Sequence, residues 1–167
     1  MNTTGPIGEL VHIYVSDAAG APMRALERAE FVHGQGIAGD RYFAGAGTYS
    51  ATAQKPSQEV TLVESERIDA FNAAHGTRLR AEDLRRNLVT RGIALNDLVG
   101  AEFAVGGVVL RGIRLCEPCK YIAGRTEDSV LPGLAHRAGL RAAIVVSGSA
   151  RVGDAIVVRS RAAGAIA

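Results

Sequence analysis

Short runs of β-branched and other apolar residues, each ended by a turn, are the feature that most limits what this chain can fold into. Such runs occupy residues 8–15, 28–33, 59–63, 87–90, 101–115, 141–146 and 155–158. Twenty glycines against five prolines supply the tight turns between them. Strands this short, with one good helix among them, predict a mainly β, barrel-like domain with short helices rather than a βαβ fold.

The clearest hairpin lies at residues 101–115. Phe103 and Val105 share a face, and Gly106-Gly107 is a two-residue turn signal. Gly112 predicts a bulge, because the apolar phase resumes one residue late after it. Residues 34–47 contain five glycines and are expected to form a shaped loop, which continues over residues 44–57 as a surface loop.

One amphipathic helix is predicted at residues 64–75. Ile68, Phe71 and Ala74 recur on one face, and Gly76 follows where a helix C-cap glycine belongs. Shorter helices are expected at residues 118–123 and from Pro132 to residue 137. We expect one domain over residues 1–167, with its core at about residues 8–158 and a frayed tail at residues 159–167.

Charge and cysteine content narrow the compartment and the partners. The formal net charge of +2 argues against binding of polyanions by bulk electrostatics. No charged-then-apolar leader opens the chain, and no apolar run approaches the roughly 20 residues that span a bilayer. Two cysteines are too few for a disulfide scaffold and fit a reducing compartment. We therefore expect a cytoplasmic protein that binds neither membrane nor nucleic acid.

The first candidate for chemistry is the segment Cys116-Glu117-Pro118-Cys119, at the end of an expected strand. Such a pair can bind zinc, cycle as a disulfide or present one reactive thiolate. A zinc site needs about four ligands, and no second such pair occurs. A thioredoxin-type pair should open a long helix in a βαβ unit. A helix N-terminus near Cys119 would direct backbone N–H groups toward its sulfur. The alternative is that both cysteines are small buried apolar residues.

The second candidate is the segment Gly36-Ile37-Ala38-Gly39-Asp40-Arg41-Tyr42. Its glycines allow the backbone to approach a ligand closely, and Arg41 can bind an anion. Asp40 can orient Arg41 or accept hydrogen bonds from loop N–H groups. A structural loop with an internal ion pair would have the same sequence.

The third candidate is an arginine-rich window at residues 78–91, which holds five of the chain's 17 arginines. On a strand, Arg85 and Asn87 would share one face, with Arg86 and Leu88 on the other. The window can bind a phosphorylated cofactor or form a solvated basic edge. It lacks the interleaved aromatic residues of a nucleic-acid site. Among the four histidines, only His136, in a Gly- and Arg-rich segment after the cysteines, is a candidate site residue.

Together and in this order, these segments resemble the MOSC domain, named from the C-terminal domain of molybdenum cofactor sulfurase. The matching stretches are "GIAGDRY" (36–42), "RRNLVTRGI" (85–93), "LVGAEFAVGGVVLRGIRLCEPC" (98–119) and "GLRAAIVVSGSARVGDAIVV" (139–158). The resemblance implies a β-barrel of the type also found in the pyruvate kinase barrel domain, decorated by short helices.

The resemblance also implies that Cys119 matches the family's reactive cysteine. In mitochondrial amidoxime-reducing components and their bacterial relatives, that thiolate ligates molybdenum held by a pterin dithiolene, and the enzymes reduce N-hydroxylated substrates by two electrons. In the sulfurase and in proposals for stand-alone domains, the domain binds the cofactor or carries sulfur. Pyridoxal phosphate is disfavoured, because the only lysines, Lys55 and Lys120, give no independent signal.

Two departures from the family are expected to matter. The N-terminal β-barrel subdomain of the two-part reductases is lacking, so this domain or a homodimer must hold the cofactor. Position 94 is Ala, where many relatives carry an acidic residue near the metal.

The leading hypothesis is a small molybdenum-dependent reductase in which Cys119 is both the catalytic residue and the metal ligand. The residues expected to contact the molybdopterin cofactor are Asp40, Arg41, Arg85, Arg86, Asn87, Lys120 and His136. The three arginines would pair with its phosphate, and Asn87 with a pterin edge or a metal oxo group. The alternative is a sulfur-carrier or cofactor-trafficking module with a persulfide on Cys119. Candidate partners are a small-molecule substrate and either an electron-donor protein or a cysteine desulfurase.

Overall fold

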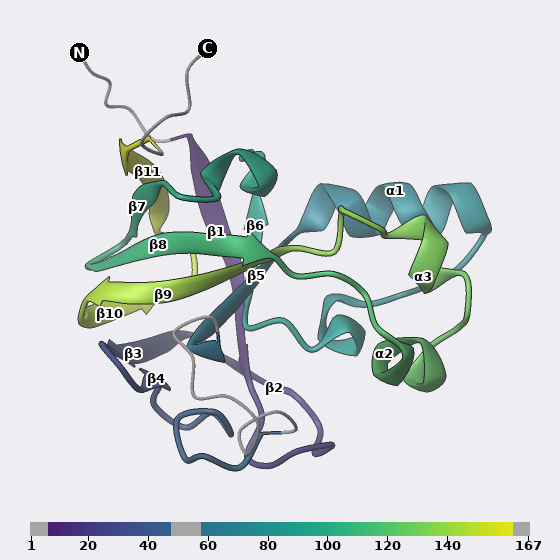
Figure 1. Cartoon of the computed structure of the whole chain (residues 1–167), viewed down its shortest axis with the longest axis horizontal. Coiled ribbons are helices and arrows are strands. Elements are labelled where there is room, and N and C mark those ends of the chain that lie inside the picture. The colour runs from purple at the N-terminus through teal and green to yellow at the C-terminus, as the bar shows by residue number, and fades with distance from the viewer. Residues whose placement is uncertain (1–6, 48–57, 162–167) are drawn as a thin grey trace.

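The computed structural model describes residues 7–47 and 58–161. Within these ranges, seven strands form the wall of a barrel: β1 (Gly8–Val15), β5 (Val60–Glu64), β6 (Leu88–Arg91), β7 (Glu102–Val105), β8 (Val108–Leu115), β9 (Leu140–Val146) and β11 (Ala155–Ser160). They lie in the order β11-β7-β8-β9-β5-β6-β1, and pairing of β11 with β1 closes the ring (Figure 1). The mainly β barrel predicted from the short strand runs is confirmed.

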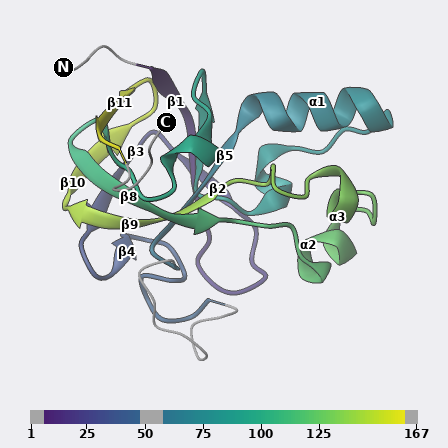
Figure 2. The same cartoon turned by 45° about the horizontal axis from the view of Figure 1, so that its top comes forward.

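A smaller sheet and several helices pack against this barrel. β2 (Arg24–Leu26) pairs with β1, while β10 (Gly148–Arg151), β3 (Arg28–Val32) and β4 (Gly36–Ile37) form a second sheet in that order. The helices are α1 (Ser65–His75), α2 (Lys120–Arg125), α3 (Val130–Gly133) and two 3-10 helices, η2 (Ala81–Leu84) and η3 (Leu95–Leu98). Figures 1 and 2 both show α1, α2 and α3 gathered on one side of the barrel. β5 and β6 pair in parallel, and the crossover connection that such a pair requires contains α1.

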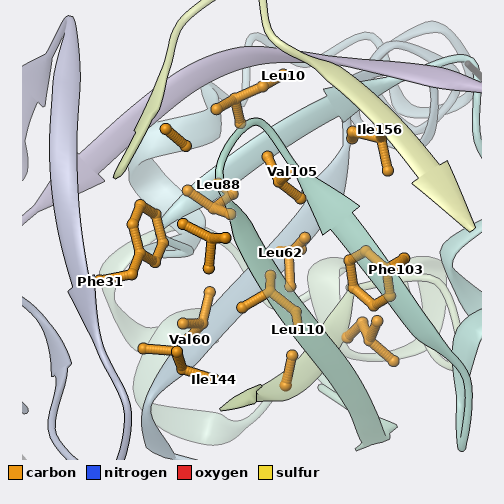
Figure 3. Packing of buried hydrophobic residues seen from close by; sticks show 14 of the residues in the cluster. Leu10, Phe31, Val60, Leu62, Leu88, Phe103, Val105, Leu110, Ile144 and Ile156 are labelled. Carbon is orange, nitrogen blue, oxygen red and sulfur yellow. The ribbon is translucent and has the colours of Figure 1, made fainter. Parts of the chain in front are cut away.

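The barrel interior is filled by aliphatic and phenylalanine side chains. Leu62, Phe103 and Leu110 come from different strands and meet in the middle, and Phe31 joins them from the second sheet (Figure 3). All four are 1% exposed or less. Burial of such a side chain contributes about 1.5–3 kcal/mol, so this cluster is a main source of the barrel's stability.

A second cluster lies between the barrel wall and the helices. Val63 and Val89 follow Leu62 and Leu88 on β5 and β6 and belong to this outer cluster, because successive side chains on a strand point to opposite faces. The outer cluster is completed by Tyr14, Ile68, Phe71, Leu79, Leu84, Ile122, Val130, Leu134 and Ala138. The wall formed by β5 and β6 is therefore apolar on both sides.

The predicted helix at residues 64–75 is present as α1, one residue shorter. Ile68 and Phe71 are buried against the outer cluster, but Ala74 is exposed, so its assignment to the apolar face is wrong. Gly76 has a φ of 64° and its N–H donates to the carbonyl of Asn72, which confirms it as the C-cap glycine.

The predicted hairpin is formed by β7 and β8, with Phe103 opposite Leu110 and Val105 opposite Val108. Gly106 occupies the turn with a φ of 58°. The pairing of β8 with β9 shifts between Gly112 and Arg114, which confirms the bulge. Gly112 is also needed for space, since a Cβ there would collide with the carbonyl oxygen of Leu98.

Other local predictions are wrong or lie outside the described residues. Residues 148–149, expected to be in a turn, belong to β10, because they pair with β3. α2 begins at residue 120 and α3 at residue 130, rather than at 118 and 132. Residues 159–160 extend β11 instead of fraying. Residues 48–57 of the expected surface loop and residues 162–167 of the tail lie outside the described residues. No helix in the described part of the chain is long and apolar enough to cross a membrane.

Candidate functional site

Cys116 and Cys119 lie in a short loop, the thiol loop (116–119), which joins β8 to α2. Both are free thiols. Cys116 is 1% exposed, whereas Cys119 is half-buried and packs against the outer cluster. Cys119 is the N-cap of α2, with an extended φ of −136°, and its carbonyl accepts the N–H of Ala123 at 3.0 Å. Cys119 is therefore the more accessible of the two sulfur atoms.

Arg86 anchors the backbone of the thiol loop. Its guanidinium is buried and donates to the carbonyl oxygens of Ala138 and Leu84, each at 2.9 Å. It also donates to the carbonyl oxygens of Cys116 and Glu117, at 3.3 and 3.4 Å. Arg86 thus fixes the backbone of the thiol loop rather than presenting its donors to solvent.

Glu117 and His136 hold the same loop at the surface. The Glu117 carboxylate accepts the backbone N–H of His136 at 2.6 Å, and its other oxygen lies 2.8 Å from the His136 Nδ1. Desolvation alone would raise the pKa of Glu117, but the hydrogen bonds and charge of His136, with the charge of Arg86, lower it overall. His136 has a left-handed φ of 62°, and its carbonyl accepts from the side chain of Asn96 at 2.9 Å. The structure therefore brings His136 to the thiol loop.

Asn87 lies between strands instead of lining a cleft. Its Nδ2 donates to the carbonyl of Tyr14 at 3.1 Å, and its Oδ1 accepts from the N–H and hydroxyl of Thr61 at 3.1 and 3.2 Å. The residue is 4% exposed and precedes β6, so its amide ties β1 to β5. The sequence-based strand predicted at residues 87–90 begins one residue later, at Leu88.

Asp40 and Arg41 form a buried ion pair at 3.1 Å beside the loop at residues 16–21. Asp40 also accepts the backbone N–H groups of Ser16 and Tyr42, at 3.0 and 3.3 Å. The Arg41 guanidinium lies 4.8 Å from the centroid of the Tyr42 ring. Asp40 therefore both orients Arg41 and shapes the loop, which are the two roles that the sequence left open.

Arg85 contacts the same 16–21 loop. It has a left-handed φ of 58° as the C-cap of η2. Its guanidinium donates to the carbonyl of Ala21 at 2.6 Å and to the Ser16 hydroxyl at 3.3 Å. Burial and then the charge of Arg41 lower its pKa; the charge of Arg125 adds to this, against Tyr121 and Asp40.

Arg125, at the end of α2, is a third arginine at this loop. Its Nη2 donates to the carbonyl of Gly20 at 3.4 Å, and its guanidinium lies 5.5 Å from the centroid of the Tyr121 ring. We call Arg41, Arg85 and Arg125 the arginine cluster. Because Arg125 and Cys119 belong to the two ends of one short helix, the cluster and the thiol are joined by α2.

A family model of the MOSC domain matches residues 48–157. The chain belongs to the MOSC family. No curated protein matches this chain.

Solved structures share the fold of this MOSC protein at low sequence identity. The YuaD protein from Bacillus subtilis superimposes with a TM-score of 0.77 at 17% identity, over 93% of this chain and 98% of YuaD. YiiM from Geobacillus stearothermophilus gives 0.75 at 13% identity, over 96% of this chain and 79% of YiiM. YiiM from Escherichia coli gives 0.67 at 14% identity, over 93% and 71%. These likenesses establish the fold, and the MOSC family is associated with molybdenum cofactor binding.

The predicted site residues of this MOSC domain fall into three groups. Cys119, Lys120 and His136 lie at or beside the thiol loop, and Lys120 is exposed as the first residue of α2. Asp40, Arg41 and Arg85 lie at the 16–21 loop, while Arg86 and Asn87 have internal partners. Ala94, at the position of the expected family difference, is exposed just before η3.

Sequence reasoning missed Tyr121 and Arg125. Their i, i+4 spacing in a helix that follows Cys119 was the available signal, because such residues share a helix face. A hollow of about 280 Å³ lies elsewhere, on the second sheet, lined by Arg28, Ser149, Ala150, Arg151 and Asp154. Within residues 7–47 and 58–161, no group of three or more His, Cys, Asp or Glu side chains is arranged to hold a metal ion.

Proposed function

We propose that this MOSC protein binds the molybdenum cofactor, with the Cys119 thiolate as its protein ligand to the metal, and reduces small N-hydroxylated or related substrates. The observation that carries this proposal is a half-buried thiol at the end of an anchored loop, joined by α2 to an arginine cluster. The electron donor would be a separate protein. A reducing compartment such as the cytoplasm keeps both thiols free for this role.

The residues fit the chemistry of this group. A thiolate is a soft ligand of the kind that suits a sulfur-bound transition metal. The pterin carries a phosphate, and arginine guanidiniums are suited to bind phosphate through paired N–H donors. Arg41 and Arg85 provide such donors from positions that are only 7% and 6% exposed, and Asp40 orients Arg41.

The cofactor, when bound, supplies two-electron chemistry at its metal. The chain positions it. Arg86 and the Glu117–His136 pair hold the thiol loop so that Cys119 keeps one orientation. Asn87 fixes β1 against β5. The carboxylate of Glu117 holds the exposed His136 ring through Nδ1, which leaves Nε2 for substrate or solvent. Lys120 is also exposed, so its ammonium would face substrate or solvent.

A second candidate function is sulfur transfer, with a persulfide carried on Cys119. The partial exposure of this thiol favours it, because a cysteine desulfurase has to reach the sulfur atom. In this role Cys119 would accept and release sulfur without a metal.

Metal analysis by mass spectrometry tests the proposal. Wild type, Cys119→Ala and the matched control Cys116→Ala would be purified from a host that makes the molybdenum cofactor. Near-stoichiometric molybdenum in wild type and Cys116→Ala, lost in Cys119→Ala, is the expected result. Equal molybdenum in all three proteins would refute the thiolate ligand. A wild type without molybdenum, whose Cys119 gains a sulfur atom on incubation with a desulfurase, would favour the second candidate.

A further inference from the structure

Three arginines from three separate segments converge on the 16–21 loop. Arg85 reaches the carbonyl of Ala21 and Arg125 reaches that of Gly20. Arg41 reaches the loop through Asp40, whose carboxylate accepts the N–H of Ser16. Each guanidinium has five N–H donors on three nitrogen atoms. Arg41 uses only its Nη1, for Asp40 and the Met23 sulfur, Arg85 uses two nitrogens and Arg125 uses one.

The charges of this cluster do not balance. In the described part of the chain, the only ion pair made by its members is that of Arg41 with Asp40. Three positive charges against one negative charge leave an excess of two. Arg85 is buried and has only neutral hydrogen-bond acceptors, which is costly for a charged group. Such a cluster is suited to an anion with about two negative charges.

The Arg125 side chain lies at the surface, next to Gly20 and Tyr121. Gly20 has no side chain, and a Cβ on it would lie 3.8 Å from the Tyr121 hydroxyl and 4.0 Å from the Arg125 Nη1. Arg125 is exposed, and its bond to Gly20, at 3.4 Å, is long for a hydrogen bond. Arg125 is thus held over the Tyr121 ring but is free to donate to a ligand.

We infer that Arg125 is a further binding residue, which completes with Arg41 and Arg85 a three-arginine site for a phosphomonoester dianion. A phosphomonoester carries about −1.5 to −2 charges at pH 7, which matches the excess. The inference rests on the proposed function, since it assigns this dianion to the phosphate of the cofactor. Tyr121 positions Arg125 without contacting the phosphate.

Titration calorimetry with inorganic phosphate tests this assignment on the full chain without cofactor. Wild type should bind phosphate, and Arg125→Gln should bind it about 10-fold more weakly or worse, because a charge-assisted hydrogen bond is lost. Arg125→Lys should fall between them, since it keeps the charge but not the paired donors. Arg151→Gln removes an exposed arginine on the second sheet and should stay within about two-fold of wild type.

Three results with the cofactor-free protein would overturn the inference. They are no phosphate binding by wild type, equal binding by Arg125→Gln and wild type, and an equal loss in Arg151→Gln. The same titration on molybdenum-loaded protein identifies the source of the phosphate. Loss of binding on loading supports the cofactor, whereas retained binding overturns its assignment to this site. Molybdenum content is measured separately, so failure of the proposed function is distinguishable from failure of the Arg125 site.

Discussion

Replacing Arg86 by Met tests how much the buried guanidinium contributes to stability. A hydrogen bond to a charged group contributes about 1.5–3 kcal/mol. The two bonds at 2.9 Å, to Ala138 and Leu84, therefore set a scale of about 3–6 kcal/mol. The longer bonds to the thiol loop add little, and the cost of burying a guanidinium no longer applies in the variant. We expect the free energy of unfolding to fall by about 3 kcal/mol.

Urea unfolding followed by circular dichroism measures this loss, since the chain has no Trp. With a slope of about 2 kcal/mol per molar urea, the midpoint should fall by about 1.5 M. Iodoacetamide should also alkylate Cys119 faster in the folded variant, because its loop has lost two anchoring bonds. Arg91→Met, at an exposed position on β6, is the matched control and should change stability by less than about 0.5 kcal/mol. An Arg86 variant as stable as this control would refute the reasoning.

Three further predictions follow from burial and close contacts. Burial raises the pKa of Glu64, so the free energy of unfolding of wild type falls as pH rises through the folded-state pKa. Over that pH range, urea unfolding should show the stability of Glu64→Gln increasing relative to that of wild type. The pKa of Glu117 is lowered from 4.5 by His136 despite desolvation, so its stabilisation is present above 4.5 and is lost as pH falls through the folded pKa. Glu117→Gln should therefore be less stable than wild type at pH 7 but not at a pH below that folded pKa, and an equal deficit at both would contradict this. Gly112→Ala should cost about 1–3 kcal/mol in thermal unfolding, because its Cβ meets a backbone carbonyl, whereas Gly124→Ala, with open space around it, should not destabilise the protein.

The sequence predicted the barrel well, because its information is local. The alternation around Phe103, the turn at Gly106 and the late phase after Gly112 each specify a strand or bulge without reference to the rest of the chain. β10 was missed because Gly148 and Ser149 have turn propensity, and only their pairing with β3 makes them a strand.

The site was predicted less completely, because it depends on contacts between distant segments. Cys119 and His136 were nominated by residue type, and Glu117 of the thiol loop contacts His136. Arg86 was expected to face a ligand, but its partners are carbonyls of segments 30 and 52 residues away. No local sequence pattern distinguishes Arg86 from Arg85, which precedes it and contacts the 16–21 loop.

The two-sided apolar wall of β5 has a consequence for how the barrel finds its register. A slip by one residue would exchange Leu62 and Val63 between the two clusters, and both are apolar, so hydrophobicity alone opposes such a slip only weakly. The side chain of Asn87 supplies the missing specificity, because its amide can satisfy the N–H and hydroxyl of Thr61 in only one alignment. Asn87 thus acts as a register pin, and its loss would first appear as misaligned or heterogeneous strands rather than as a weaker core.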